Sequence, residues 1–204
     1  MELILIRHGE TIWNKEGRVQ GVSDIGLSDV GLRQAQALSL SLKNHLIHSI
    51  YASPLIRARK TAQIINRYHH APIYFAPELM EMDQGDFEGL TFQELMACEK
   101  EFVQRWIKDP ATVAMPNGES FSELQNRAWS VVAKIIDKTE HAMVVSHNFT
   151  IAAVLCKIRN ISLSQFRKVC VDTASKTVVS FRNGSASIDV LNDRTHLMNM
   201  NMED

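Results

Sequence analysis

Two uninterrupted apolar runs, Leu3 to Ile6 and Ala142 to Val145, are the strongest strand signals in the sequence. Such runs are typical of the central strands of a parallel sheet, which are buried on both faces. Ile50 to Ser53 and Ile73 to Phe75 are shorter apolar segments of the same kind. The pattern therefore predicts four strands spread over the first three quarters of the chain.

A late hairpin and an early helix are also visible in the pattern. Residues 177–181 and 186–191 are strand-like segments on either side of Asn183-Gly184, a dipeptide suited to a tight turn, and they predict a β-hairpin. From Val30 to roughly Leu42, apolar residues recur on one helical face, and Ser28 stands where a helix N-cap is expected.

Other helix starts are marked by capping residues. Ser53-Pro54 is expected to open a helix, since proline suits the first helical position. A Ser or Thr followed three residues later by Glu or Gln predicts a capping box. This spacing occurs at Thr91 and Glu94, Ser120 and Glu123, and Ser162 and Gln165.

Strands that alternate with helices predict a three-layer α/β/α sandwich with a mostly parallel central sheet. No repeat, low-complexity stretch or linker interrupts the chain, so residues 1–204 are expected to form a single domain. Residues 83–118 have the least strand-like pattern. We expect this segment to make an excursion over one end of the sheet, where it would cover the substrate and influence its selection.

Composition excludes several classes of protein. Of the 204 residues, 45 % are hydrophobic, which is enough for a large core and excludes disorder. The net charge of −1 predicts no long-range attraction to nucleic acid or to a membrane. The partner is therefore expected to be a small molecule, and affinity for a phosphate would come from a few local cations.

Cysteine content bears on the compartment. Cys98, Cys156 and Cys170 are odd in number and form no CxxC pair, so neither a disulfide framework nor a thiolate zinc site is expected. A reducing cytoplasm fits this pattern. The apolar run at the start is too short for a signal peptide or a membrane span.

Reactive side chains follow three of the predicted strands. Arg7-His8 follows the first, Arg57 the second, and Ser146-His147 the strand at 142–145. The carboxyl ends of parallel strands lie along one edge of a sheet, where open α/β folds bind ligands. One histidine at a strand end is more often structural than catalytic, and Arg59-Lys60 reads as a solvated helix face. Two histidines and two arginines converging at one edge are harder to explain by packing.

A metal or nucleotide cofactor is not expected. The histidines form no HxH or HExxH spacing, and the adjacent His69-His70 would point in different directions. No Walker loop is present, and no GxGxxG follows the first strand. The convergent cations would have to act without a metal.

Four ordered blocks carry a resemblance to a known family. The first is Arg7 to Thr11 with Trp13-Asn14 and Gly17-Arg18; the others are Ser53 to Ala58 with Thr61-Ala62, Glu81 with Gly85 and Glu88-Gly89, and Ser146-His147 after an apolar strand. In this order and spacing they resemble the histidine phosphatase superfamily, the phosphoglycerate mutase-like proteins. The resemblance implies the phosphoglycerate mutase-like form of the α/β/α sandwich.

The resemblance also implies roles for individual residues. His8 would be the nucleophile that becomes phosphohistidine, and Glu81 would be the general acid. The phosphate would be bound by Arg7, Asn14, Gln20, Gly21, Arg57 and His147. Asn148 stands where many members have glycine, and we expect it to add a polar contact at the edge of the substrate pocket.

Physical chemistry is consistent with these roles. Phosphoryl transfer needs positioning and electrostatic stabilisation of the equatorial oxygens, which forked guanidiniums supply. The same cations should lower the pKa of His8 and keep it neutral, as a nucleophile must be. His147, if protonated, would add a third cation.

The reaction itself has alternatives, because mutases and phosphatases of this family share a catalytic core. Residues 99–117 contain Arg105 and Lys108 but no adjacent arginine pair. Phe102, Trp106 to Pro110 and Gly118 to Ser120 resemble a pattern of the short phosphatases. Hydrolysis of a phosphomonoester is therefore favoured, with phosphoserine as the leading substrate and α-ribazole 5'-phosphate or broad specificity as others. A cofactor-dependent phosphoglycerate mutase and an inactive phosphate-binding pseudo-phosphatase are the alternatives. A homodimer formed through an apolar patch at residues 169–171 is left open, since core burial would explain that patch equally well.

Overall fold

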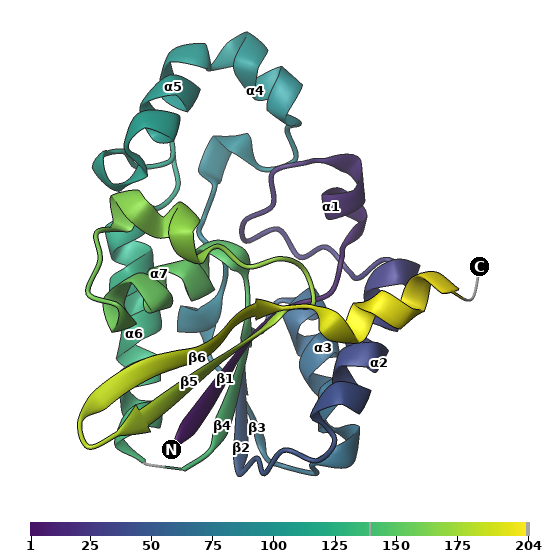
Figure 1. Cartoon of the computed structure of the whole chain (residues 1–204). Helices are drawn as coiled ribbons and strands as arrows, with labels where there is room; N and C mark the ends of the chain where they lie inside the picture. Colours follow the sequence, from purple (N-terminus) through teal and green to yellow (C-terminus); the bar gives the residue numbers. More distant parts are fainter. Residues whose placement is uncertain (139, 203–204) are drawn as a thin grey trace.

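The computed structural model describes residues 1–138 and 140–202 and contains a six-stranded sheet with the order β3-β2-β4-β1-β5-β6 (Figure 1). Strands β3, β2, β4 and β1 are parallel, and β5 and β6 add an antiparallel hairpin at one edge. The strands are β1 (Glu2–Arg7), β2 (Ser49–Ala52), β3 (Ile73–Phe75), β4 (Ala142–Ser146), β5 (Lys176–Arg182) and β6 (Ser185–Asp193). The predicted mostly parallel sheet is confirmed.

Helices cover both faces of this sheet, so the predicted three layers are present. The α-helices are α1 (Ile12–Glu16), α2 (Asp29–Leu42), α3 (Ile56–Ile65), α4 (Phe92–Cys98), α5 (Lys100–Lys108), α6 (Phe121–Asp137) and α7 (Asn148–Ile158). Short 3₁₀ helices are η1 (Asn66–Tyr68), η2 (Pro77–Leu79), η3 (Gly85–Phe87), η4 (Pro110–Thr112), η5 (Leu163–Val169) and η6 (Thr195–Met202). Helices α6 and α7 lie on one face and α2 and α3 on the other (Figure 1).

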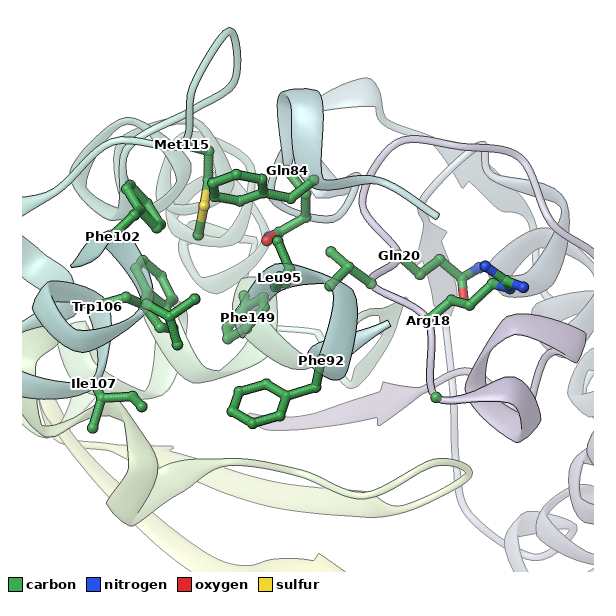
Figure 2. A pocket seen from close by; sticks show the side chains of 14 residues that line it. Arg18, Gln20, Gln84, Phe92, Leu95, Phe102, Trp106, Ile107, Met115 and Phe149 are labelled. Atoms are coloured by element: carbon green, nitrogen blue, oxygen red, sulfur yellow. The ribbon is translucent and has the colours of Figure 1, made fainter. Parts of the chain in front are cut away.

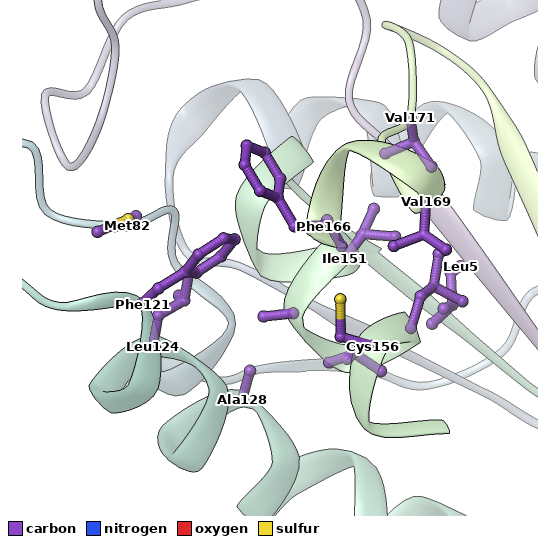
Figure 3. Packing of buried hydrophobic residues seen from close by; sticks show 14 of the residues in the cluster. Leu5, Met82, Phe121, Leu124, Ala128, Ile151, Cys156, Phe166, Val169 and Val171 are labelled. Atoms are coloured by element: carbon purple, nitrogen blue, oxygen red, sulfur yellow. The ribbon is translucent and has the colours of Figure 1, made fainter. Parts of the chain in front are cut away.

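The sheet separates two apolar layers. Alternate residues of β1 face opposite layers, with Leu3 and Leu5 toward α6 and α7, and Ile4 and Ile6 toward α2 and α3. In the first layer Phe121 is fully buried among the residues that Figure 3 displays, and truncating a side chain of this kind to alanine costs about 3–5 kcal/mol. Burial on both faces explains why β1 is continuously apolar.

Most predicted helix starts are confirmed, with two corrections. Ser28 caps α2, and the capping boxes at Thr91 and Ser120 are present. Helix α3 begins at Ile56 rather than at Pro54, because Leu55 has a non-helical ψ of 135° and is the N-cap. Ile56 N then donates to Asp24 Oδ1 at 2.6 Å.

The second correction concerns Ser162. Its hydroxyl accepts from Ser164 N, not from Gln165, and the helix that follows is 3₁₀. Phe166 and Val169 are its buried residues, and their spacing of three matches the 3₁₀ period. The segment Leu163–Val169 is only 7 residues long, and 3₁₀ helices occur mainly in short segments.

The C-terminal hairpin has the predicted turn, since Asn183 and Gly184 both adopt positive φ (51° and 75°) as a type I′ turn needs. The apolar patch considered for a dimer is not on the surface. Val169 and Val171 are both buried in the first core layer (Figure 3), so they offer no patch to a second copy.

Residues 83–118 carry η3, α4, α5 and η4, and they lie beyond the carboxyl ends of the parallel strands (Figure 1). An isolated bridge between Ala114 and Ser120 returns the chain to α6. The function of covering a substrate stays a prediction at this point.

Candidate active site

The register of the sheet brings two of the predicted histidines together. Arg7 pairs with Ser146 across β1 and β4, so the residues that follow, His8 and His147, leave the sheet side by side. His8 N donates to Ser146 O at 3.1 Å, and the two imidazole centroids are 5.0 Å apart in an edge-to-face arrangement. Both rings are buried.

The protonation state of His8 follows from its partner. Its Nδ1 lies 2.7 Å from Gly9 O, and because a carbonyl oxygen can only accept, Nδ1 must carry the proton. Burial, together with the charges of Arg57 and Arg7, lowers the pKa of His8 well below the ordinary value and keeps the ring neutral. A neutral ring protonated at Nδ1 has its lone pair on Nε2, which is the state of a nucleophile.

His147 has the opposite tautomer. Arg57 Nε donates to His147 Nδ1 at 3.2 Å, so Nδ1 is unprotonated and the proton of the neutral ring is on Nε2. Burial, then Arg57, lowers the pKa of His147 well below its ordinary value. The condition under which His147 would add a third cation is thus not met in this structure, where the ring presents a neutral N–H donor. That donor is buried without a partner in the described part of the chain.

Arg57 is held from several sides. The side chain is 1 % exposed, and its Nη1 and Nη2 donate to Ser23 O at 2.8 Å and to Gly21 O at 2.6 Å. The Gln20 amide, with its oxygen turned toward the guanidinium, accepts from Arg57 Nη1 at 3.0 Å and donates to Thr11 Oγ1 at 2.6 Å. Burial lowers the pKa of Arg57 to about 10, so the group stays cationic at neutral pH.

Gly21 contributes through its backbone and its small size. A Cβ at this position would lie 2.3 Å from Glu88 Oε1 and 2.6 Å from Met82 O, so no larger residue fits. The Glu88 carboxylate accepts from Val22 N and Ser23 N at 2.6 and 2.7 Å. These contacts fix the loop whose carbonyls hold Arg57.

Arg7 is the second arginine whose charge acts on both histidines. Its Nη1 donates to Val171 O at 2.6 Å, whereas its Nε is buried without a partner among the described residues. Burial lowers the pKa of Arg7, although its ordinary value is so high that the charge is retained. Buried donors without partners are rare in folded proteins and call for an explanation. Arg7 Nε and His147 Nε2 are two such donors within one site.

Asn148, predicted to lie at the edge of the substrate pocket, binds the loop that contains Val171. Its Oδ1 accepts from Val171 N at 3.0 Å, and Val171 O in turn accepts from Arg7. Asn148 therefore supports the loop that holds Arg7, a role that reasoning from the sequence did not anticipate. A contact between Asn148 and a substrate at the pocket edge stays a prediction.

Glu81 lies against the N-terminus of α7. Its Oε1 accepts from Met82 N, Thr150 N and Thr150 Oγ1 at 2.9–3.2 Å, and its Oε2 accepts from Phe149 N at 3.2 Å. Free N–H groups at a helix start are suited to a carboxylate. The side chain is 5 % exposed, so its position is well defined.

Arg127 holds the backbone at Glu81, a role that the sequence did not predict. Its Nη2 donates to Glu81 O at 2.9 Å, and its Nη1 donates to Met80 O and Glu78 O at 2.8 and 2.7 Å. A salt bridge of 2.6 Å to Glu119 orients the guanidinium. Neither Arg127 nor Thr150 belongs to a motif, so only a three-dimensional structure reveals their contacts.

The side-chain oxygen of Asn14 takes part in capping helix α1. Asn14 is the third residue of α1, and its Oδ1 accepts from Thr11 N at 3.1 Å in a capping box. The amide nitrogen of Asn14 remains available to a ligand. It is the donor that phosphate binding by Asn14 would require. The cap also holds the side chain in a fixed orientation.

The residues that the structure describes contain no group of three or more His, Cys, Asp and Glu side chains that could hold a metal ion. The cysteines are free, with Cys156 buried, Cys98 exposed and Cys170 half-buried. Among residues 1–138 and 140–202, no helix has the length and apolar character needed to cross a membrane.

An apolar cavity of about 320 Å³ borders this cluster (Figure 2). Its wall is made by α4, α5 and neighbouring loops, with Phe92, Phe102 and Trp106 among the side chains. Its lining also includes Gln20, which contacts Arg57, and Phe149, whose backbone contacts Glu81. The cavity thus begins where the polar cluster ends.

Comparison with known proteins agrees with this geometry. Residues 3–194 match the histidine phosphatase superfamily (branch 1). The chain is 32 % identical over 199 residues to phosphoserine phosphatase 1 of Hydrogenobacter thermophilus, covering 97 % of this chain and 94 % of the relative. It is 33 % identical over 201 residues to a metal-independent phosphoserine phosphatase of Arabidopsis thaliana, covering 96 % and 83 %. The solved structure of Bacillus stearothermophilus YhfR superposes with a TM-score of 0.91 at 30 % identity, covering 96 % of this chain and 98 % of that one. The chain is a member of the histidine phosphatase superfamily.

Proposed function

We propose that the chain is a phosphatase that hydrolyses small phosphate monoesters through a phosphohistidine at His8. The observation that carries this proposal is the pair of unpartnered buried donors, Arg7 Nε and His147 Nε2, beside a neutral His8. A phosphoryl group would accept from both donors. The two guanidiniums would stabilise the charge on its equatorial oxygens. Because they are already held in place, they do not have to reorient during phosphoryl transfer.

In the first step, His8 Nε2 forms a bond to phosphorus as the bond to the leaving oxygen breaks. Glu81 in its acid form gives that oxygen a proton, and the product alcohol departs. In the second step, water attacks the phosphohistidine, Glu81 takes one of its protons, and His8 is restored with release of inorganic phosphate. Glu81 Oε2 accepts a single hydrogen bond in the described part of the chain, so it is the oxygen better placed to carry the proton.

Hydrolysis, rather than transfer to a second hydroxyl, is supported by residues 99–117. A mutase needs cations beyond the phosphate site to hold a carboxylate-bearing intermediate. Here Arg105 lies over the Phe102 ring at 5.7 Å, Lys108 is exposed, and neither lines the cavity. Phosphoserine is the first specific substrate to test, since two similar proteins carry that name.

Trapping the intermediate tests the proposal. Enzyme quenched during turnover should carry a phosphate on His8 that is labile in acid and stable in base. His8→Ala should lose activity by about 10³-fold or more, while His48→Ala, which alters an exposed residue just before the amino end of β2, should retain it. Retention of more than about a tenth of the activity by His8→Ala would remove His8 as nucleophile, since loss of a nucleophile normally has a far larger effect.

Catalysis without a metal is a further part of the proposal, supported by the cationic cluster already present at the site. Extensive dialysis against EDTA should leave kcat unchanged. Activity that is lost and then restored by Mg²⁺ or Zn²⁺ would contradict this mechanism. A cytoplasmic location is proposed from the three unpaired thiols, which suit a reducing compartment.

A further inference from the structure

The apolar cavity described above has a composition that suits a particular kind of ligand. Phe92 and Leu95 of α4, and Trp106 and Ile107 of α5, face it together (Figure 2). Arg18 is the charged side chain among its described lining residues, and that guanidinium already donates to Glu16 Oε2 and to Gly89 O, both at 2.7 Å. The cavity therefore offers an incoming group apolar surface and few free polar partners.

Its connection to the phosphate site identifies which part of a substrate would enter it. Gln20 contacts Arg57, which belongs to the phosphate site, and also lines the cavity. Phe149 lines the cavity, while its backbone N–H donates to the Glu81 carboxylate that would protonate the leaving oxygen. A group attached to that oxygen would thus be directed into the cavity.

From these contacts we infer that the cavity binds the leaving group, and that the preferred substrates are phosphate monoesters of apolar alcohols or phenols. This inference rests on the proposed function. It departs from phosphoserine, because the ammonium and carboxylate of serine would enter a largely apolar space without charged partners, and an unpaired buried charge is costly.

Size and exposure support the same conclusion. A volume of about 320 Å³ lies at the lower end of the usual range for small-molecule sites, enough for an alkyl chain or one aromatic ring. Phe92 and Ile107, on the cavity wall, are 60 % and 54 % exposed. Two large apolar side chains left open to water beside one cavity are explained if a ligand covers them during turnover.

A substrate series tests the inference without changing the chemistry. Propyl, hexyl and 3-phenylpropyl phosphate have alcohol leaving groups of nearly equal acidity, so differences in kcat/KM report contacts beyond the oxygen. Each methylene buried in the cavity should raise kcat/KM by about fourfold, since burying one contributes about 0.8 kcal/mol. Hexyl and 3-phenylpropyl phosphate should therefore exceed propyl phosphate by at least tenfold, and should also exceed phosphoserine.

The outcomes separate the two proposals. Hydrolysis of the whole series at one rate, or faster hydrolysis of phosphoserine than of hexyl phosphate, would overturn the apolar leaving group and leave the phosphatase proposal intact. No hydrolysis of any of these esters, or of p-nitrophenyl phosphate, would overturn the phosphatase proposal itself.

Variants locate the effect in the cavity. Phe92→Ala and Ile107→Ala alter exposed residues of two different helices, so at least one should fold. Each should lower the ratio of kcat/KM for hexyl over propyl phosphate by about four- to sixteenfold, the effect of losing contact with one or two methylenes. Phe75→Ala is the matched control, because Phe75 is also exposed (45 %) but does not line the cavity, and its ratio should equal that of the wild type. An unchanged ratio in folded Phe92→Ala and Ile107→Ala would contradict the inference.

Discussion

The phosphate end and the cavity end of this site are built on different principles. At the phosphate end, His8 and His147 emerge from paired central strands, and their polar atoms bond to the backbone or to another side chain, or are buried donors without a partner among the described residues. At the cavity end, residues 83–118 supply most of an apolar wall with little directional bonding. Rigid central strands can keep the catalytic residues in one geometry. A segment outside the sheet can differ in sequence, and so in substrate preference, without disturbing that geometry.

This difference has a physical consequence for substitutions. Changes at the phosphate end should slow every substrate to a similar degree, because all monoesters present the same phosphoryl group. Changes at the cavity end should alter ratios between substrates, because only the leaving group touches them. The ratio of kcat/KM for hexyl over propyl phosphate therefore reports which end a residue serves.

Arg57→Lys should have the largest effect among the conservative changes. Lysine keeps the charge but loses the fork that donates to His147 Nδ1 and to the Gly21 and Ser23 carbonyls, so kcat/KM should fall by about 10²- to 10³-fold. The loss should be equal for propyl and hexyl phosphate. Arg59→Lys on the exposed face of the same helix serves as the control. A changed ratio in Arg57→Lys would show that the two ends are not independent.

Glu81→Gln sharpens the comparison at the boundary between the two ends. Glutamine cannot donate the proton, so alkyl phosphates should slow by about 10²-fold, whereas p-nitrophenyl phosphate should slow by less than about tenfold because its leaving group needs little protonation. Within the alkyl series the ratio should not change. Equal losses on alkyl and nitrophenyl esters would assign the acid to another group, with Asp83 as the nearest candidate in sequence.

Much of the phosphate end could be predicted from the sequence because its residues follow directly from strand ends. Arg7, His8 and His147 are fixed by apolar runs that only a central strand explains, and parallel pairing then brings them together. The neutral state of His147 could not be predicted, since it depends on which of its nitrogens faces Arg57. That contact joins residues 90 positions apart.

The cavity end was predictable only as a location. Residues 83–118 were expected over one end of the sheet, but their pattern does not reveal that aromatic side chains from α4 and α5 enclose a space with Phe149. Arg127 was missed for a related reason: it acts on backbone carbonyls, which have no sequence signature. Tertiary contacts of this kind depend on how helices dock, and local patterns do not encode docking.

Lowering the pH should destabilise the protein through several buried or half-buried histidines, two of which, His8 and His147, lie at the phosphate end. Both His8 and His147 have a lowered pKa in the folded protein, whereas in the unfolded chain each binds a proton near pH 6.5. As the pH falls below 6.5, the unfolded state takes up protons that the folded state does not, so the free energy of unfolding decreases by up to about 1.4 kcal/mol per pH unit for each histidine. Urea titrations between pH 7.5 and 5.5 should show this slope.

Replacing one of these histidines tests the origin of that slope. His147→Asn should reduce the loss of stability between pH 6.5 and 5.5 by about 1 kcal/mol, since one titrating group is removed and its unfolded form is already half protonated at pH 6.5. Phe92→Ala, at the cavity end, should leave the pH dependence as it is in the wild type. A slope that is unaltered in His147→Asn would mean that the acid sensitivity arises elsewhere in the fold.

Asn148→Ala is expected to have the smallest effect, and it tests where the boundary between the two ends lies. Asn148 touches both sides: its Oδ1 holds Val171 N, and Val171 O holds Arg7, while its neighbour in sequence, Phe149, lines the cavity. Alanine preserves the start of α7 but removes the acceptor, which should cost about 1 kcal/mol of stability and loosen the acceptor of Arg7. We expect kcat/KM to fall by about five- to tenfold for propyl and hexyl phosphate alike, the equivalent of roughly 1–1.4 kcal/mol. If the ratio between the two substrates changed instead, Asn148 would act through Phe149 on the leaving group, and it would belong to specificity rather than to the positioning of Arg7.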